Sequence, residues 1–139
     1  MASTLPDNRR ELLLGIGAAA GSLVLGLALV GIAATDRIAL LSEIAVVAVL
    51  LVCGFAYGIG GLDDIVARGI PKRGVAHLVI GAGIVLALLA PYGTPERLFV
   101  ATAAVALLVG AGYHAALAVG LLSATEEPAA ELDSDGETG

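Results

Sequence analysis

A single acid, Glu43, interrupts the apolar run of residues 38–61, and its type and position could support chemistry. If this run is a membrane-spanning helix, Glu43 lies five residues inside it, or ~7–8 Å below the boundary at the helical rise. An ionisable group inside a membrane is costly and is by default a functional site. The residue is therefore a candidate proton- or cation-coupling carboxylate, with Thr102, at a similar depth in a later run, as a candidate partner.

Arg37 and Arg97 are further candidate partners, and the alternative for Glu43 is an acid close enough to the interface to be hydrated or paired with Arg97. We favour it because the cost of a buried charge falls towards the interface. Small four-span multidrug transporters are similar in carrying one intramembrane Glu, but they place it in the first span among Trp and Tyr. This chain departs from that pattern on both counts.

Two histidines, His77 and His114, raise the possibility of a haem or redox subunit, since histidines on facing helices can ligate haem axially. Counted from the ends of their apolar runs, they differ in depth by ~9 Å at the helical rise, which disfavours an axial pair. We expect His77 to be interfacial and His114, beside Tyr113, to be hydrogen-bonded within the bundle. The single Cys53 lies mid-run, where its thiolate is disfavoured. We predict no cofactor, no metal site and no catalytic set.

Four apolar runs must position these residues: 12–34, 38–61, 75–90 and 98–122. The chain is 58% apolar and only 14% charged, whereas a soluble domain is nearer half apolar and a quarter charged. Long uncharged runs with short polar connections are typical of transmembrane helices. The sequence predicts an all-α integral membrane bundle of four transmembrane helices, built from two helical hairpins.

The polar segments complete the organisation: residues 1–11 before the transmembrane domain at 12–122, the connector 62–74, and an acidic tail at 123–139. In the connector, Asp64 and Arg68 are spaced for a helical ion pair on a short surface helix. Nucleic-acid binding is not expected, because the chain has no basic face. The acidic, Ala-rich tail resembles the soluble ends of haloarchaeal membrane proteins; this resemblance is compositional and implies no function.

Lys and Arg are unevenly divided between the two ends of the predicted spans. One end would hold five of them and the other end two: Arg9, Arg10, Arg68, Lys72 and Arg73 against Arg37 and Arg97. The positive-inside rule then predicts a multi-pass protein of the cell membrane with both termini cytoplasmic. Arg9-Arg10 before an apolar run also resembles a twin-arginine export signal, but this run is longer than a usual signal core and three more follow.

Small residues are expected to mediate helix packing, because they allow close backbone approach in a membrane. Two GxxxG pairs are candidates: Gly17 with Gly21, and Gly54 with Gly58.

Short similarities between the two hairpins suggest a duplicated unit with a parallel repeat. That repeat would place Tyr57 and Tyr113 at similar depths.

Three functions remain open from the residues alone. The first, which we favour, is a non-catalytic accessory subunit or scaffold that packs in a homo-oligomer or a larger membrane complex. The second is an oligomeric transporter or channel that uses Glu43. The third is a haem or redox subunit that uses His77 and His114.

Overall fold

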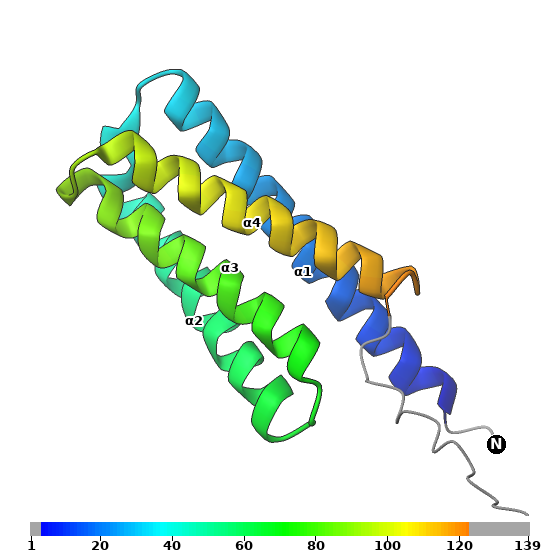
Figure 1. Cartoon of the computed structure of the whole chain (residues 1–139). Helices are drawn as coiled ribbons and strands as arrows, with labels where there is room; N and C mark the ends of the chain where they lie inside the picture. Colours follow the sequence, from blue (N-terminus) through cyan, green and yellow to red (C-terminus); the bar gives the residue numbers. More distant parts are fainter. Residues whose placement is uncertain (1–3, 123–139) are drawn as a thin grey trace, which may run out of the picture.

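The computed structural model describes residues 4–122, which form four long helices and no strand within that range (Figure 1). The helices are α1 (Thr4–Ala34), α2 (Ile44–Val66), α3 (Pro71–Leu89) and α4 (Glu96–Ala118). All four contain a segment long and apolar enough to cross a membrane. The predicted all-α bundle of four transmembrane helices is confirmed, and the chain belongs to the broad class of multi-pass membrane proteins.

The run 38–61 is not one helix. Its first part forms a short 3-10 helix, η1 (Ile38–Ser42), and α2 begins only at Ile44. Ile38 and Leu41 turn into the core at this end of the bundle. Glu43 lies between η1 and α2 with an extended backbone, so its predicted position inside a helical span is wrong.

The predicted connector is much shorter than expected, because α2 continues to Val66 and α3 begins at Pro71. Proline suits the first turn of a helix, where its missing N–H is not needed. Gly69 has a positive φ of 65°, which glycine adopts without steric cost, and it lets the chain reverse between the two helices. The extension of both helices places Asp63, Asp64 and Arg73 on helical turns instead of in a surface loop.

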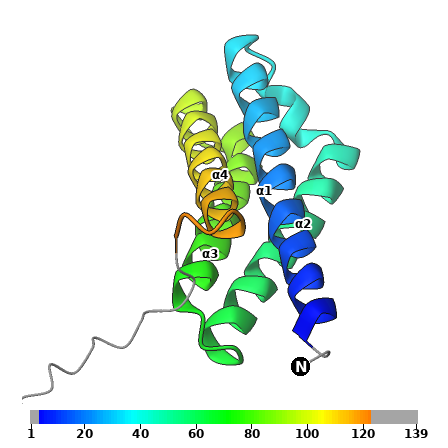
Figure 2. The same cartoon turned by 90° about the vertical axis from the view of Figure 1, so that its right-hand side faces the viewer.

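Helix packing follows a different order from the chain. Helix α1 packs on α4, α4 on α3, and α3 on α2, whereas α1 and α2 make little direct contact (Figures 1 and 2). Buried Ser22 on α1 donates a hydrogen bond of 2.6 Å to the Leu107 carbonyl on α4, which ties the first helix to the last. A seam is therefore left between α1 and α2.

Glycines bring the packed helices close together, but only partly at the predicted positions. Gly61 on α2 faces Gly74 on α3 so closely that a Cβ on Gly61 would lie 2.9 Å from the Gly74 carbonyl oxygen. Gly54 packs against Ile84 of α3, as expected for a packing residue. Gly17 and Gly58 do not mediate close packing within the described part of the chain. A Cβ placed at either position would meet no atom within 4 Å.

The fourth predicted packing residue, Gly21, lies in the seam. A Cβ placed there would lie 3.4 Å from the Tyr57 hydroxyl of α2.

A compact apolar core fills the end of the bundle that holds η1 and the second 3-10 helix, η2 (Ala90–Tyr92). Leu41, Ile84 and Val100 are almost completely buried there. On the surface of the same end, exposed Arg97 pairs with Asp36 at 3.0 Å. The buried ionisable residues Asp64 and His114 lie towards the opposite end.

Candidate functional site

A buried carboxylate, Asp64, is the centre of the polar cluster. It lies in the last turns of α2 and is only 3% exposed. Arg73 in the first turns of α3 binds it with two hydrogen bonds, from Nε to Oδ2 at 2.8 Å and from Nη2 to Oδ1 at 2.6 Å. Bidentate pairs of this kind are strong and fix both side chains in one orientation. The short α2–α3 connection makes this pairing possible, because it brings both helix ends together.

His77 extends the cluster by one helical turn from Arg73. Its Nδ1 lies 3.0 Å from Asp64 Oδ2 and 3.1 Å from the Arg73 carbonyl oxygen. Both neighbours are acceptors, so Nδ1 carries a proton and donates it. In the neutral ring the other nitrogen, Nε2, then has a free lone pair.

His114 of α4 completes the cluster from the other side. Its ring centroid is 4.3 Å from that of His77, and the residue is 1% exposed. Its Nε2 is buried without a hydrogen-bond partner among residues 4–122. Buried polar atoms normally have a partner, and an exception points to a water, an ion or a ligand that the site accepts.

Tyr57 lies on the same side of α2 as Asp64, about two turns away. Its ring centroid is 5.7 Å from that of His77, and its hydroxyl donates a 2.6 Å hydrogen bond across the seam to the Ala18 carbonyl. This bond joins α1 to α2, which otherwise have little contact.

Three further charged residues, from α1 and from the end of α2, lie next to the Asp64 cluster. Arg68 donates from Nε to Asp63 Oδ2 at 2.7 Å, and its Nη1 is 3.8 Å from Glu11 Oε1 of α1. All three side chains are about half exposed. They lie at the end of the bundle that holds the α2–α3 connection.

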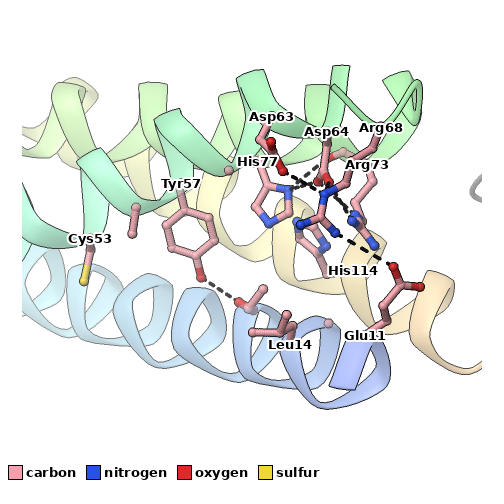
Figure 3. A pocket seen from close by; sticks show the side chains of 14 residues that line it. Glu11, Leu14, Cys53, Tyr57, Asp63, Asp64, Arg68, Arg73, His77 and His114 are labelled. Carbon is pink, nitrogen blue, oxygen red and sulfur yellow. Dashed lines mark hydrogen bonds and ion pairs between the residues drawn. The ribbon is translucent and has the colours of Figure 1, made fainter. Parts of the chain in front are cut away.

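These groups line a cavity of about 380 Å³ between α1 and α2 (Figure 3). Its polar end holds Asp64 with its partners and, at the mouth, the three charged residues Glu11, Asp63 and Arg68. Small and apolar residues line the rest: Leu14, Gly15, Ala18, Cys53, Ala56 and Gly60. Small-ligand sites typically have volumes of ~300–1,000 Å³, mostly apolar walls and a few convergent polar groups. The cavity has all three properties.

The predicted site residues are divided by the structure. Tyr57 and His114 line the cavity, and Tyr113 lies half-buried beside a groove between α3 and α4. Thr102 is exposed on the outer face of α4. Glu43 is exposed and makes no ion pair within residues 4–122, so the structure does not bring it together with Thr102, Arg37 or Arg97.

The predicted depth gap between His77 and His114 is wrong. Helix α3 begins at Pro71 and α4 ends at Ala118, so the two histidines lie six and four residues from the same end of the bundle. The difference is ~3 Å at the helical rise, and the rings are in contact. The error arose because the sequence analysis placed the start of α3 and the end of α4 each four residues too far along the chain.

Sequence reasoning missed Asp64 and Arg73 as buried groups, because it assigned both to a surface connector. The Pro71-Lys72-Arg73 segment carried a usable signal, since proline at a first helical position predicts a helix start there. With that start, Arg73 and His77 are spaced i, i+4 on one face of α3. The predicted Asp64–Arg68 pair is present only at 3.8 Å, secondary to the Arg73 pair.

The cluster does not fit a haem between the two histidines, because their rings touch and His77 Nδ1 is engaged by Asp64. No group of three or more metal-ligating side chains is close enough to hold a metal ion within the part of the chain that the structure describes. The arrangement is suited instead to hydrogen bonding and charge pairing with a ligand.

Comparison of the chain with protein-family models, curated proteins and solved structures gives no match. The class of protein is therefore defined by the fold and the cavity alone.

Proposed function

We propose that this protein is a membrane-embedded binding protein that takes up a small ligand in the cavity between α1 and α2. The observation that carries the proposal is the buried Asp64–Arg73–His77–His114 cluster, which faces the cavity and contains an unpartnered Nε2 on His114. Ionisable groups inside membrane bundles are expensive and mark substrate or ion pathways.

Binding from one side of the membrane fits better than an open channel. The cavity extends from Glu11 and Asp63 at the bundle end as far as Cys53 in the middle of α2. Beyond it the bundle contains apolar core residues, among them Leu29, Leu50 and Ile84. A static water-filled path across the whole bundle has no support in this packing.

The earlier alternatives change accordingly. A transport function would use the Asp64 cluster as its coupling site, since Glu43 is outside the helices and exposed. A haem function has no support, because the contact between the rings of His77 and His114 leaves no space for a macrocycle.

The native Cys53, the only cysteine in the chain, allows a direct test of the cavity. We expect a cationic methanethiosulfonate reagent to modify Cys53 in phosphatidylcholine nanodiscs, because an open cavity with a charged mouth admits water and reagent. An Ala18→Phe change should slow the reaction, since the added ring occupies the cavity. The rate is measured by mass spectrometry over time.

Two matched variants in a Cys53→Ala background complete this experiment. Val52→Cys moves the thiol to a position that is 70% exposed on the outer face of α2, and Ala104→Cys moves it into the core. Both should react slowly, because apolar surroundings disfavour the thiolate. A Cys53 rate equal to that of Ala104→Cys would show that the cavity is closed and would contradict the proposal.

Assembly with further copies or a larger membrane complex is a second proposal, and it is compatible with ligand binding. Gly17 on α1 and Gly112 on α4 are exposed, and a Cβ at either position would meet nothing within 4 Å. Another helix could approach closely at such positions. The mass of the protein particle in mild detergent tests the proposed assembly. A monomer without partners would contradict it.

For location, we propose the cell membrane, with the cavity mouth on the cytoplasmic side. Arg68, Lys72 and Arg73 lie at the same end of the bundle as Arg9 and Arg10, which supports this orientation through the positive-inside rule.

A further inference from the structure

We propose that the ligand of the α1–α2 cavity is an anionic lipid, whose acidic headgroup binds at Arg68 while one of its hydrocarbon chains extends along the seam towards Cys53. This inference rests on the proposed function and names its ligand class. Three features of the cavity support it: the unused N–H groups of its two arginines, its division into a polar and an apolar end, and its position beside the seam.

Both oxygens of the buried acid are already engaged by N–H groups of Arg73 and His77. Asp64 Oδ1 accepts from Arg73 Nη2, and Oδ2 accepts from Arg73 Nε and faces His77 Nδ1 at 3.0 Å. A cationic ligand would have to break these contacts to reach the carboxylate.

The arginines, in contrast, have donors to spare. A guanidinium carries five N–H groups. Arg68 uses only its Nε–H in a hydrogen bond within residues 4–122, because its Nη1 is 3.8 Å from Glu11 and thus beyond hydrogen-bonding distance. Arg73 uses Nε–H and one N–H of Nη2, which leaves the second N–H of Nη2 and both of Nη1. These unused N–H groups suit a ligand rich in acceptors, such as a phosphate, which arginine binds well.

Glu11 identifies where that headgroup would sit. Its carboxylate comes from α1 and faces Arg68 across the mouth at 3.8 Å, while Asp63 holds the other side of Arg68. An acidic headgroup that binds the free face of Arg68 replaces Glu11 there. Glu11 is thus a competitor of the ligand, and its removal should strengthen binding.

The shape of the cavity fits an amphiphile in the orientation of a membrane lipid. From Asp64 to Cys53 the α2 helix rises ~16 Å towards the middle of the membrane. Along this path the charged walls give way to Leu14, Ala18 and Ala56. His114 Nε2 is the one buried side-chain nitrogen or oxygen without a partner in the described chain, and His114 lines the polar end, where we expect a headgroup oxygen to satisfy it.

Entry from the bilayer is possible because α1 and α2 have little direct contact along the seam. One chain of a diacyl lipid would occupy the cavity and the other would stay in the surrounding membrane. Basic pockets between transmembrane helices on the cytoplasmic side are known sites for anionic headgroups.

The test is native mass spectrometry of the full-length protein in mild detergent, titrated with dioleoyl phosphatidylglycerol or dioleoyl phosphatidylcholine. The two lipids have the same chains, so a difference reports the headgroup. We expect phosphatidylglycerol to bind about tenfold more tightly, equivalent to about 1.4 kcal/mol. Equal affinity for both lipids would overturn the proposal.

Matched variants assign the binding to Arg68. Arg68→Gln should remove the preference for phosphatidylglycerol, whereas Arg97→Gln should leave it unchanged. Both are exposed arginines that pair with an aspartate, but Arg97 lies at the opposite end of the bundle. Glu11→Gln should increase the affinity. Equal losses in Arg68→Gln and Arg97→Gln would show non-specific charge attraction and would overturn the site.

Cys53 reports whether the lipid chain enters the cavity. Phosphatidylglycerol should protect Cys53 from the methanethiosulfonate reagent, and inorganic phosphate, which lacks a chain, should not. If inorganic phosphate protects Cys53 as well as the lipid does, the ligand is a free anion and the lipid proposal is wrong. If Cys53 reacts in the lipid-free protein but neither lipid protects it, the lipid proposal fails while the cavity of the proposed function stands.

Discussion

The ion pair between Asp64 and Arg73 carries two charges into a membrane bundle, and its energetic value lies in orientation more than in stability. A buried pair gains strong attraction but loses the hydration of both ions, so its net contribution is often near zero. What the bidentate geometry supplies is a fixed carboxylate that holds His77 at 3.0 Å in one tautomer. The pair therefore prepares the wall of the cavity.

His114 is expected to lower stability in exchange for binding. A buried polar atom without a partner costs ~1–3 kcal/mol, because it has lost its hydrogen bond to water. Changing His114→Leu removes this atom and keeps an apolar side chain of similar bulk, so the free energy of unfolding should rise by ~1–3 kcal/mol. Denaturant titration of the purified protein in detergent measures it.

The same variant should bind phosphatidylglycerol more weakly, because the headgroup loses one partner. Greater stability with weaker binding is the expected combination at a functional site. A stability loss with unchanged lipid binding would mean that His114 is a packing residue.

At the scale of elements, the α2–α3 hairpin is held together by close backbone approach. The Gly61 position has no room for a methyl group, since the neighbour at 2.9 Å is the backbone oxygen of Gly74, which cannot rotate away as a side chain can. Overpacking of this kind costs ~1–3 kcal/mol. The polar cluster depends on this contact, because Asp64 lies three residues after Gly61 and Arg73 lies immediately before Gly74.

We expect Gly61→Ala to destabilise the protein by ~1–3 kcal/mol and to weaken lipid binding. Gly58→Ala, one turn earlier on the same helix, should be close to neutral, because its Cβ would meet nothing within 4 Å. Thermal unfolding in detergent compares the two variants. Equal effects would show that helix propensity, not the approach of α2 to α3, determines the outcome.

For the whole molecule, the orientation in the membrane is open to a simple measurement. In a Cys53→Ala background, a cysteine at Ala67 lies in the α2–α3 connection and one at Thr94 lies at the opposite end. We expect a membrane-impermeant maleimide to label Thr94→Cys in intact cells and to label Ala67→Cys only after permeabilisation. The reverse pattern would place the cavity mouth outside the cell.

The sequence was sufficient for the number of helices and for their membrane character, because long apolar runs have few alternatives. It was not sufficient for the candidate site. In the sequence, Asp64 and Arg73 resemble ordinary solvent-exposed charges. Their burial depends on the contact between α2 and α3, which the sequence alone does not specify. Glu43 was placed inside a helical span because its single charge was read as an interruption of one helix, whereas the structure ends η1 at Ser42 and begins α2 at Ile44.

The packing of α1 on α4 also has a consequence for the synthesis of the protein. A ribosome makes α1 first and α4 last, so the first helix enters the membrane without its main packing partner. Helices α2 and α3 can join as soon as both have emerged, because a short turn connects them. The cavity is thus completed only when translation has reached Leu107, whose carbonyl accepts the hydrogen bond from Ser22. Until then, α1 is free to meet lipid or another chain along the face that α4 later covers.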